Sequence, residues 1–357
     1  MKDSYKLAAV QMEIRNRKYP YALINDIRKI IITASSKKVD VIVFPDYMDL
    51  NLIPYYIKDS ISHINSSVSS LTDVLKNIFK TNSFFVKELV FKELINLARK
   101  YNIFISSGGW LEIEKNKFKK SIAFISPSDG IILEGISTHL YPWEYDLNFF
   151  QGENLLFNKD TLGSVGILVG GEIYFPEISR ILSLLGTRIL LASSIYRFFF
   201  IPPSKSGLKN EYYQEKDKFK HSHNENESNY SQGNNIFKYS DDESKSSTST
   251  SYNDFKYRAG IWRDVQQNQV FACESFLLGS LGNDKLEGRA SIIGPCEITN
   301  DSSGIIAQAS SYDKEEVIVG EVKISDLKKI REKYPINKYL NHELYKKYLP
   351  NLYEKTG

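Results

Sequence analysis

The sequence has few cysteines and no marked excess of charge of either sign. Its 357 residues include only two cysteines, Cys273 and Cys296, too few for a disulfide framework or a four-thiolate zinc site. Lysine and arginine number 46 against 43 aspartate and glutamate, and the formal net charge is +3. A dedicated nucleic-acid-binding domain is normally far more basic. The composition therefore argues against a disulfide-rich secreted scaffold and against a nucleic-acid partner.

Long uninterrupted apolar runs are also missing. The most lipid-like stretch, residues 181–202, is broken by Gly186, Arg188 and Arg197, which is typical of a buried helix end followed by a buried strand. Residues 1–6 lead into a short apolar run with no cleavage-site pattern, so they do not resemble a signal peptide. We therefore expect a cytoplasmic protein with no membrane partner.

Apolar residues, by contrast, are plentiful and regularly spaced. They make up 42% of the chain, and aromatic residues 13%, which is enough for a large core. Strand-like runs and helically spaced segments alternate in the first half, and strands then follow one another directly. Strands are predicted at 7–12, 39–44, 103–107, 121–126, 131–137, 164–169, 188–192, 270–275, 290–293, 304–308 and 316–322, and helices at 21–36, 85–101, 176–185, 257–267 and from an N-cap at Ser325. This order predicts an α+β fold of mixed sheets covered by helices.

Two segments differ in composition from this single domain, which spans residues 1–357. Residues 203–256 are rich in polar residues, and their section 239–251 has no aliphatic residue, which predicts a disordered insertion. His221 and His223 lie within it, but no further ligands are nearby, so we expect no metal there. The tail, residues 334–357, is rich in tyrosine, lysine and asparagine, and we expect it to be an oligomer contact.

Polar side chains follow two of the predicted strands. Asp46 comes directly after the run at 39–44, where open α/β sheets place their ligand sites, although it could equally cap the next segment. The strand at 131–137 leads into a loop that could line a pocket or simply pack against its own side chains. That loop carries Ser137, His139, Tyr141, Trp143 and Glu144.

A third polar segment follows the strand at 164–169. The chain turns at Gly170 and Gly171 into a helix that begins near Pro176. Many hydrolases place a nucleophile at such a strand–turn–helix junction, because the turn exposes one side chain beside helix N–H groups. Here the turn offers no side chain, and Glu172 and Tyr174 follow it.

Together these segments resemble the nitrilase, or carbon–nitrogen hydrolase, superfamily. The resemblance rests on residues 7–12, the Phe-Pro-Asp corner at 44–46, Thr-His-Leu at 138–140 and the segment 175–180, and it continues at Trp262, 268–270, 288–291 and 294–295. It implies a four-layer α-β-β-α sandwich that pairs into a dimer. It also implies acyl transfer without a cofactor: a Glu acts as base, a Lys stabilises the oxyanion, and a Cys attacks an amide or nitrile carbon.

The resemblance places unexpected residues at the three catalytic positions. Asp46 stands at the Glu position, Ser137 at the Lys position and Gly170 at the Cys position, while Glu144 lies near the family's auxiliary glutamate. Glycine cannot form a covalent intermediate, and Lys to Ser removes a positive charge from the oxyanion site. We therefore expect a non-catalytic member, a pseudoenzyme, that acts as a binding or structural subunit.

The resemblance leaves partners, ligand and an alternative function open. The subunit would form a homodimer or pair with an active relative, and its ligand would be a small amide or carboxylate. The alternative is a divergent amide hydrolase that uses Cys273, Cys296 or the carboxylates at 46, 144 and 172. Pocket candidates are His139, Tyr141, Trp143, Gly171, Glu172 and Tyr174. A pocket plugged by Tyr141, Trp143 or Tyr174 would indicate a purely structural role.

Overall fold

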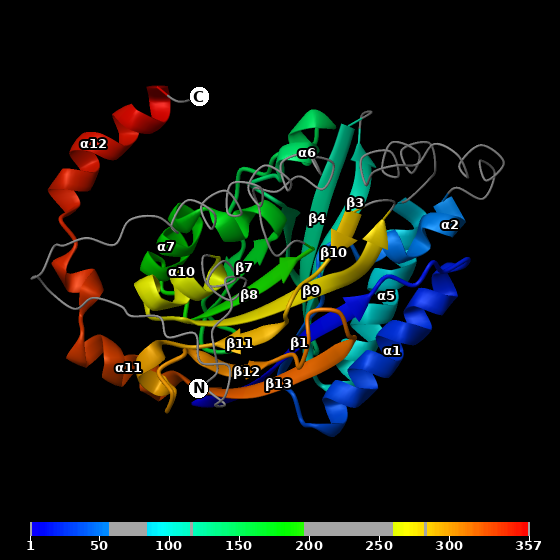
Figure 1. Cartoon of the computed structure of the whole chain (residues 1–357), viewed down its shortest axis with the longest axis horizontal. Helices are drawn as coiled ribbons and strands as arrows, with labels where there is room; N and C mark the ends of the chain where they lie inside the picture. Colours follow the sequence, from blue (N-terminus) through cyan, green and yellow to red (C-terminus); the bar gives the residue numbers. More distant parts are fainter. Residues whose placement is uncertain (1, 57–83, 115–116, 196–259, 282–283, 356–357) are drawn as a thin grey trace, which may run out of the picture.

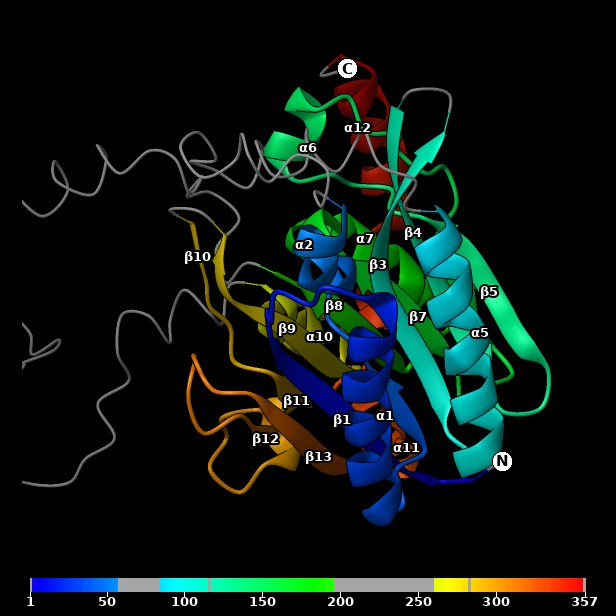
Figure 2. The same cartoon turned by 90° about the vertical axis from the view of Figure 1, so that its right-hand side faces the viewer.

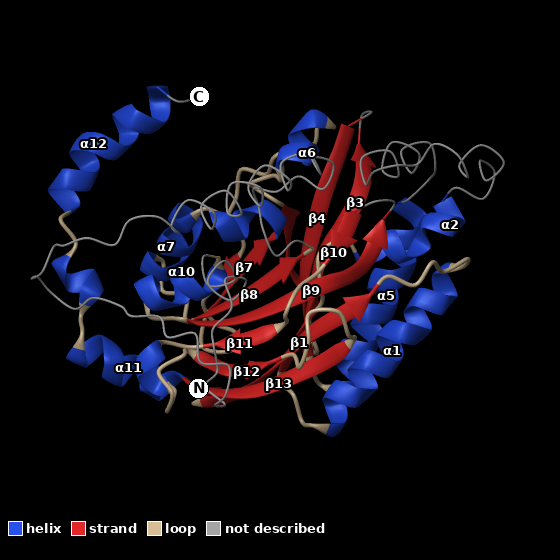
Figure 3. Cartoon of the chain, in the orientation of Figure 1, coloured by secondary structure: helices blue, strands red, loops and turns tan. Residues whose placement is uncertain are grey.

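The computed structural model describes residues 2–56, 84–114, 117–195, 260–281 and 284–355, and its strands form two packed layers (Figure 3). The first layer has the order β5-β4-β3-β2-β1-β13, with β1 (Ser4–Glu13), β2 (Val41–Val43), β3 (Phe104–Glu114), β4 (Lys117–Ser126), β5 (Gly130–Ile136) and β13 (Glu316–Lys323). The second has the order β6-β7-β8-β9-β11-β12, with β6 (Phe157–Asn158), β7 (Val165–Val169), β8 (Ile189–Ser194), β9 (Phe271–Leu281), β11 (Ser291–Ile293) and β12 (Ile305–Gln308). The layers are joined where β1 pairs in parallel with β9, and β10 (Asp284–Leu286) extends β9 as a hairpin.

Helices cover the outer face of each layer (Figures 1 and 2). The pair α1 (Pro20–Ser36) and α5 (Phe84–Tyr101) packs on the first layer, and the pair α7 (Pro176–Leu184) and α10 (Ile261–Asn268) packs on the second. The short elements are η1 (Met48–Leu52), α2 (Ile53–Tyr56), α6 (Pro142–Asp146), η2 (Gly170–Tyr174) and η3 (Cys296–Ile298). The chain ends with α11 (Ile324–Lys333), η4 (Ile336–Tyr339) and α12 (His342–Lys355).

The alternation of side chains along each strand produces the four layers. Leu190 of β8 points towards α7 and α10, whereas its neighbour Leu191 packs between the two sheets. In β1, Ala8 packs on the side of α1 and α5, and Ala9 packs between the sheets. Because both strand faces are covered, the central strands are nearly continuous apolar runs in the sequence. The predicted α-β-β-α sandwich is therefore confirmed.

Most predicted elements are present, and one predicted cap is wrong. Ser325 lies inside α11 rather than at its N-cap, which is Lys323. The carboxylate of Asp3 accepts hydrogen bonds from the Ser325 amide and hydroxyl, at 2.8 and 2.7 Å, so the N-terminal segment satisfies this helix start. Strands also run further than expected, since β3 reaches Glu114, β4 begins at Lys117 and β9 reaches Leu281.

Several expectations concern the ends and insertions of the chain. The predicted insertion at 203–256, with His221 and His223, lies outside the described residues. The tail contains a helix that the sequence did not predict, α12, which stands away from the layered body in Figure 1. Among the described residues, no helix combines the length and the apolar character needed to cross a membrane.

The two-layer core predicts a strong dependence of stability on residues between the sheets. Leu191 and Ile32 each carry a four-carbon side chain, but in opposite environments. Leu191 is fully buried, whereas Ile32 on α1 is 49% exposed. We expect Leu191→Ala to lower the free energy of unfolding by about 2–5 kcal/mol because it leaves a cavity. Ile32→Ala should change it by less than about 0.5 kcal/mol. Denaturant titration of both variants tests this, and equal losses would contradict the two-layer packing.

Candidate functional site

A sharp corner after β2 delivers a buried carboxylate. The chain leaves β2 through Pro45, and Asp46 is fully buried. Two glycines of β3 make room for this corner: a Cβ at Gly108 would lie 2.0 Å from the Pro45 carbonyl oxygen, and one at Gly109 would lie 2.1 Å from Asp46 Oδ1. The Tyr47 amide then donates to the Gly109 carbonyl at 2.9 Å. The corner and β3 therefore form one rigid unit that points Asp46 inwards.

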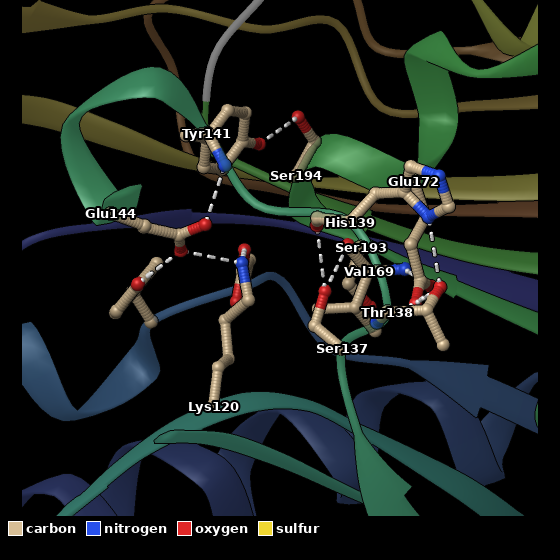
Figure 4. Close-up of polar contacts among 12 residues, drawn as sticks. Lys120, Ser137, Thr138, His139, Tyr141, Glu144, Val169, Glu172, Ser193 and Ser194 are labelled. Atoms are coloured by element: carbon tan, nitrogen blue, oxygen red, sulfur yellow. Dashed lines mark hydrogen bonds and ion pairs between the residues drawn. The ribbon is translucent and has the colours of Figure 1, made fainter. Parts of the chain in front are cut away.

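A lysine from β4 lies against this carboxylate. Lys120 is fully buried, and its Nζ lies 3.1 Å from Asp46 Oδ2 and 2.7 Å from Glu144 Oε1 (Figure 4). Lys120 also stands directly across the sheet from Ser137, whose amide donates to the Lys120 carbonyl at 3.1 Å. A buried cation therefore lies beside Asp46, and it comes from the strand that faces Ser137.

The second carboxylate, Glu144, is held in place by its own short helix. Glu144 Oε2 accepts a hydrogen bond from the Tyr141 amide at 2.6 Å, which closes the first turn of α6. Its Oε1 accepts hydrogen bonds from Lys120 and from the Tyr47 hydroxyl. Glu144 has no solvent exposure. Both of its oxygens are thus used, and its position is determined by three different elements.

The charges of this cluster shift the pKa values of its members. Burial raises the pKa of Asp46, Lys120 lowers it and Glu144 raises it, and the outcome is a pKa of about 7. Burial lowers the pKa of Lys120, but the charges of Asp46 and Glu144 outweigh this effect and raise it above its ordinary value. The lysine is therefore an ammonium ion at neutral pH. Asp46 Oδ1 is buried and has no hydrogen-bond partner.

The turn after β7 faces the same cluster. Gly170 has a φ of +62°, a conformation that favours glycine, and it directly follows the end of β7. A Cβ at residue 170 would lie 2.2 Å from Lys120 Nζ and 2.8 Å from Asp46 Oδ2. The ammonium group of Lys120 therefore occupies the space into which a side chain at the strand tip would project.

The remaining predicted polar residues hold the loops together. Ser137 Oγ donates to the carbonyl of His139 at 3.0 Å and to that of Val169 at 3.2 Å (Figure 4). The Glu172 carboxylate accepts hydrogen bonds from the Val169 amide and from the amide and hydroxyl of Thr138. These hydrogen bonds connect the loop after β5 to the turn at Gly170. Ser137 and Glu172 therefore hold the two segments together.

Aromatic side chains enclose the cluster. Lys120 Nζ lies 5.0 Å from the ring centroid of Tyr47 and 4.9 Å from that of Tyr141. Trp143 stacks on Tyr141 with centroids 6.0 Å apart. Burial is the main cause that raises the pKa of Tyr141 and of Tyr174, so both phenols stay neutral. Tyr141 and Trp143 thus cover the cluster, but the group that fills its centre is Lys120.

His139 and Gly171 lie on the rim of this junction. The His139 ring packs on Phe175 with centroids 4.3 Å apart, and burial lowers its pKa. A Cβ at Gly171 would lie 2.8 Å from the Leu140 carbonyl oxygen, so the turn packs closely on the loop after β5. Both residues therefore contribute to the packing of the turn.

Neither cysteine belongs to the cluster. Cys273 is buried between the two sheets, where burial raises the pKa of its thiol, and Cys296 lies in η3, where its amide donates to Gln266. Among the described residues, no group of three or more histidine, cysteine, aspartate and glutamate side chains is placed to hold a metal ion. The chemistry of the cluster is therefore that of one ammonium ion and two carboxyl groups.

Lys120 was missed because its strand begins earlier than the sequence suggested. Within β4, Lys120 shares a strand face with Ile122 and Phe124, which pack between the sheets. A lysine two residues before such an inward-facing run points inwards, and this alternation was the signal available in the sequence. Its carboxylate partners lie 74 and 24 residues away along the chain, so no local pattern connects them.

The sequence and the fold are similar to those of known proteins. The family model described as "Carbon-nitrogen hydrolase" matches residues 6–223. Among solved structures, the carbon–nitrogen hydrolase from Helicobacter pylori G27 is 14% identical with a TM-score of 0.63, over 96% of this chain and 97% of that chain. A variant of the amidase from Nesterenkonia sp. AN1, which carries the acetamide moiety of fluoroacetamide on its active-site cysteine, is 12% identical with a TM-score of 0.57, over 95% and 97%.

At these identities the two structures establish the fold alone, and no curated protein matches the sequence. The family model covers more than half of the chain, and its match includes the β2 corner, the loop after β5 and the turn at Gly170. The chain is therefore a member of the carbon–nitrogen hydrolase family.

Proposed function

We propose that this chain has lost the covalent amide chemistry of its family and acts as a binding or structural subunit. The observation that carries the proposal is the contact between Gly170 and Lys120. The strand tip presents no side chain, and Lys120 Nζ occupies the space where one would project. A thioester route requires a sulfur at this point, with room for an acyl group beside it. Neither is available at the described site.

No other thiol among the described residues can readily take the place of the missing one. Cys273 is fully buried between the sheets, and a thiol with a raised pKa is a poor nucleophile. Cys296 lies in η3, in the loop between β11 and β12, where its amide donates to Gln266 and its carbonyl accepts a hydrogen bond from Thr299. A small amide or carboxylate ligand would reach the cluster only if Lys120 moved aside.

One observation favours a divergent amide hydrolase as the second candidate. Asp46 combines a buried oxygen that lacks a hydrogen-bond partner with a pKa of about 7, and a general base that activates water has these properties. Against it stands the burial of Asp46, Lys120 and Glu144, none of which has solvent exposure. The non-catalytic subunit and the divergent hydrolase differ in whether the Asp46 carboxylate contacts a substrate.

Purified protein incubated with short aliphatic amides and nitriles tests the proposal. We expect no turnover above the uncatalysed rate and no mass increase of the intact chain, because no nucleophile faces the site. Product assays and intact-protein mass spectrometry measure the two quantities.

Two variants would show which side chain is responsible for any activity that is found. Turnover lost in Asp46→Asn but kept in the double variant Cys273→Ser, Cys296→Ser would establish the divergent hydrolase instead. Turnover or an acyl adduct lost in the double cysteine variant would show that a thiol elsewhere has become the nucleophile. Either result contradicts the proposed loss of amide chemistry.

The exposed C-terminal helix supports a role as a subunit, and we take its partner to be a second copy of this chain. Along α12, Tyr345, Tyr348, Leu349 and Leu352 recur at helical spacing and are 42–56% exposed. The outer face of α7 carries a second exposed apolar group, Ile181, Leu184 and Leu185. The Tyr353 hydroxyl donates to Glu177, near the start of α7, at 2.8 Å.

Glutamate substitutions on either face of α12 test whether its apolar face forms the dimer contact. We expect Tyr348→Glu with Leu352→Glu to shift the protein from dimer to monomer, because the apolar face of α12 would no longer be buried. Lys347→Glu on the opposite face changes the net charge by the same amount and should leave the dimer intact. Analytical ultracentrifugation measures both. A monomeric native chain, or equal dissociation by both variants, would refute the contact.

A further inference from the structure

The surroundings of Lys120 have the composition of a binding site for an ammonium group. Its Nζ has one carboxylate oxygen at 3.1 Å and another at 2.7 Å, from Asp46 and Glu144. The rings of Tyr47 and Tyr141 flank it at 5.0 and 4.9 Å from their centroids. Carboxylates combined with aromatic faces are the usual means by which proteins bind organic ammonium ions. All five side chains are buried.

The ammonium end of Lys120 lies in the space that Gly170 leaves open, and its methylene arm passes Gly109. A Cβ on residue 170 would approach the ammonium nitrogen to 2.2 Å and the Tyr141 ring to 3.1 Å. Across the ladder, Ser137 turns its hydroxyl to backbone carbonyls instead of towards the cluster. The residue types at 120, 137 and 170 are therefore compatible with one another. Lys120 fills the enclosure, and Ser137 and Gly170 place no side chain in it.

We propose that the enclosure formed by Asp46, Glu144, Tyr47 and Tyr141 is a binding site for a primary alkylammonium group, and that Lys120 occupies it as a tethered ligand. Alanine at residue 120 removes the atoms from Cγ to Nζ, which correspond to one n-propylammonium ion. The proposal goes beyond the loss of amide chemistry, because it states what the enclosure binds. Turnover by the native chain would overturn the proposed function and leave this binding site intact.

The test is chemical rescue of Lys120→Ala. We expect the variant to melt well below the native protein, because two buried carboxyl groups lose their cation. Millimolar n-propylammonium should raise its melting temperature by ~2–4 °C at about ten times the dissociation constant. The neutral analogue 1-propanol should give no such rise. Buried cavities made by truncation do admit small ligands that match their lining.

Lys119→Ala serves as the matched control. Lys119 is the preceding residue of β4, and its ammonium pairs with Glu112 and Glu114 near the surface. Neither this variant nor the native protein should be stabilised by n-propylammonium. Rescue of Lys120→Ala by both compounds equally would mean simple cavity filling, and rescue by neither would mean no ammonium site. Both results overturn the proposal.

A second chain keeps the proposal testable if Lys120→Ala does not fold. Lys120→Ser combined with Ser137→Lys moves the lysine across the ladder to the facing residue of β5. We expect this chain to fold with a melting temperature above that of Lys120→Ser alone, because the cation again reaches Asp46 and Glu144. A double variant that is no more stable than Lys120→Ser would refute the view that the enclosure selects an ammonium group.

Gly170→Ala, placed in both the native chain and the Lys120→Ser chain, measures the contact with Lys120 directly. The strain of a side chain at φ +62° is common to both chains and cancels in the comparison. Only the native chain has Lys120 Nζ 2.2 Å from the added Cβ. We expect a larger fall in melting temperature in the native chain. Equal falls would show that Lys120 does not depend on glycine at residue 170.

Discussion

The balance of charge around Lys120 is the constraint on which this end of the sandwich depends. A buried ammonium ion is tolerable only when nearby carboxylates and aromatic faces replace its hydration. Asp46 and Glu144 supply that replacement from the corner after β2 and from α6. Because removal of one partner of a buried ion pair typically costs about 3–5 kcal/mol, these segments cannot change independently.

The same cluster illustrates how a charge can be brought to one point of a sheet from either of two neighbouring strands. The resemblance assigns the lysine to residue 137, directly after β5, yet the cation enters from β4. Positions that face each other across an antiparallel ladder project side chains on the same side, so a charge can move between them while the backbone stays in place. A sequence motif therefore specifies the backbone position from which a side chain projects. The site depends instead on the position of the charged group at the end of that side chain.

The sequence predicted what depends on local periodicity and failed where contacts are distant. The apolar run of β8 and the helical spacing along α5 were readable, because each pattern reports burial within one element. The roles of Asp46 and Gly170 as strand-end residues were readable for the same reason. Lys120 was not, since its partners are brought to it by the pairing of β3 with β4 and by the turn into α6. The cap of α11 failed likewise, because Asp3 reaches it from more than 300 residues away.

The closed site and the exposed surface are connected through one short segment. Gly170 begins η2, and η2 leads directly into α7, whose outer face carries Ile181, Leu184 and Leu185. The Glu172 carboxylate fastens η2 to the end of β7 and to the loop after β5, so the direction of α7 is determined at the same junction that encloses Lys120. In an amide hydrolase this junction would aim a nucleophile at a substrate. In this chain the junction has no side chain at its tip and determines where α7 begins, and the close packing of the ion cluster behind it restricts how far that direction can change.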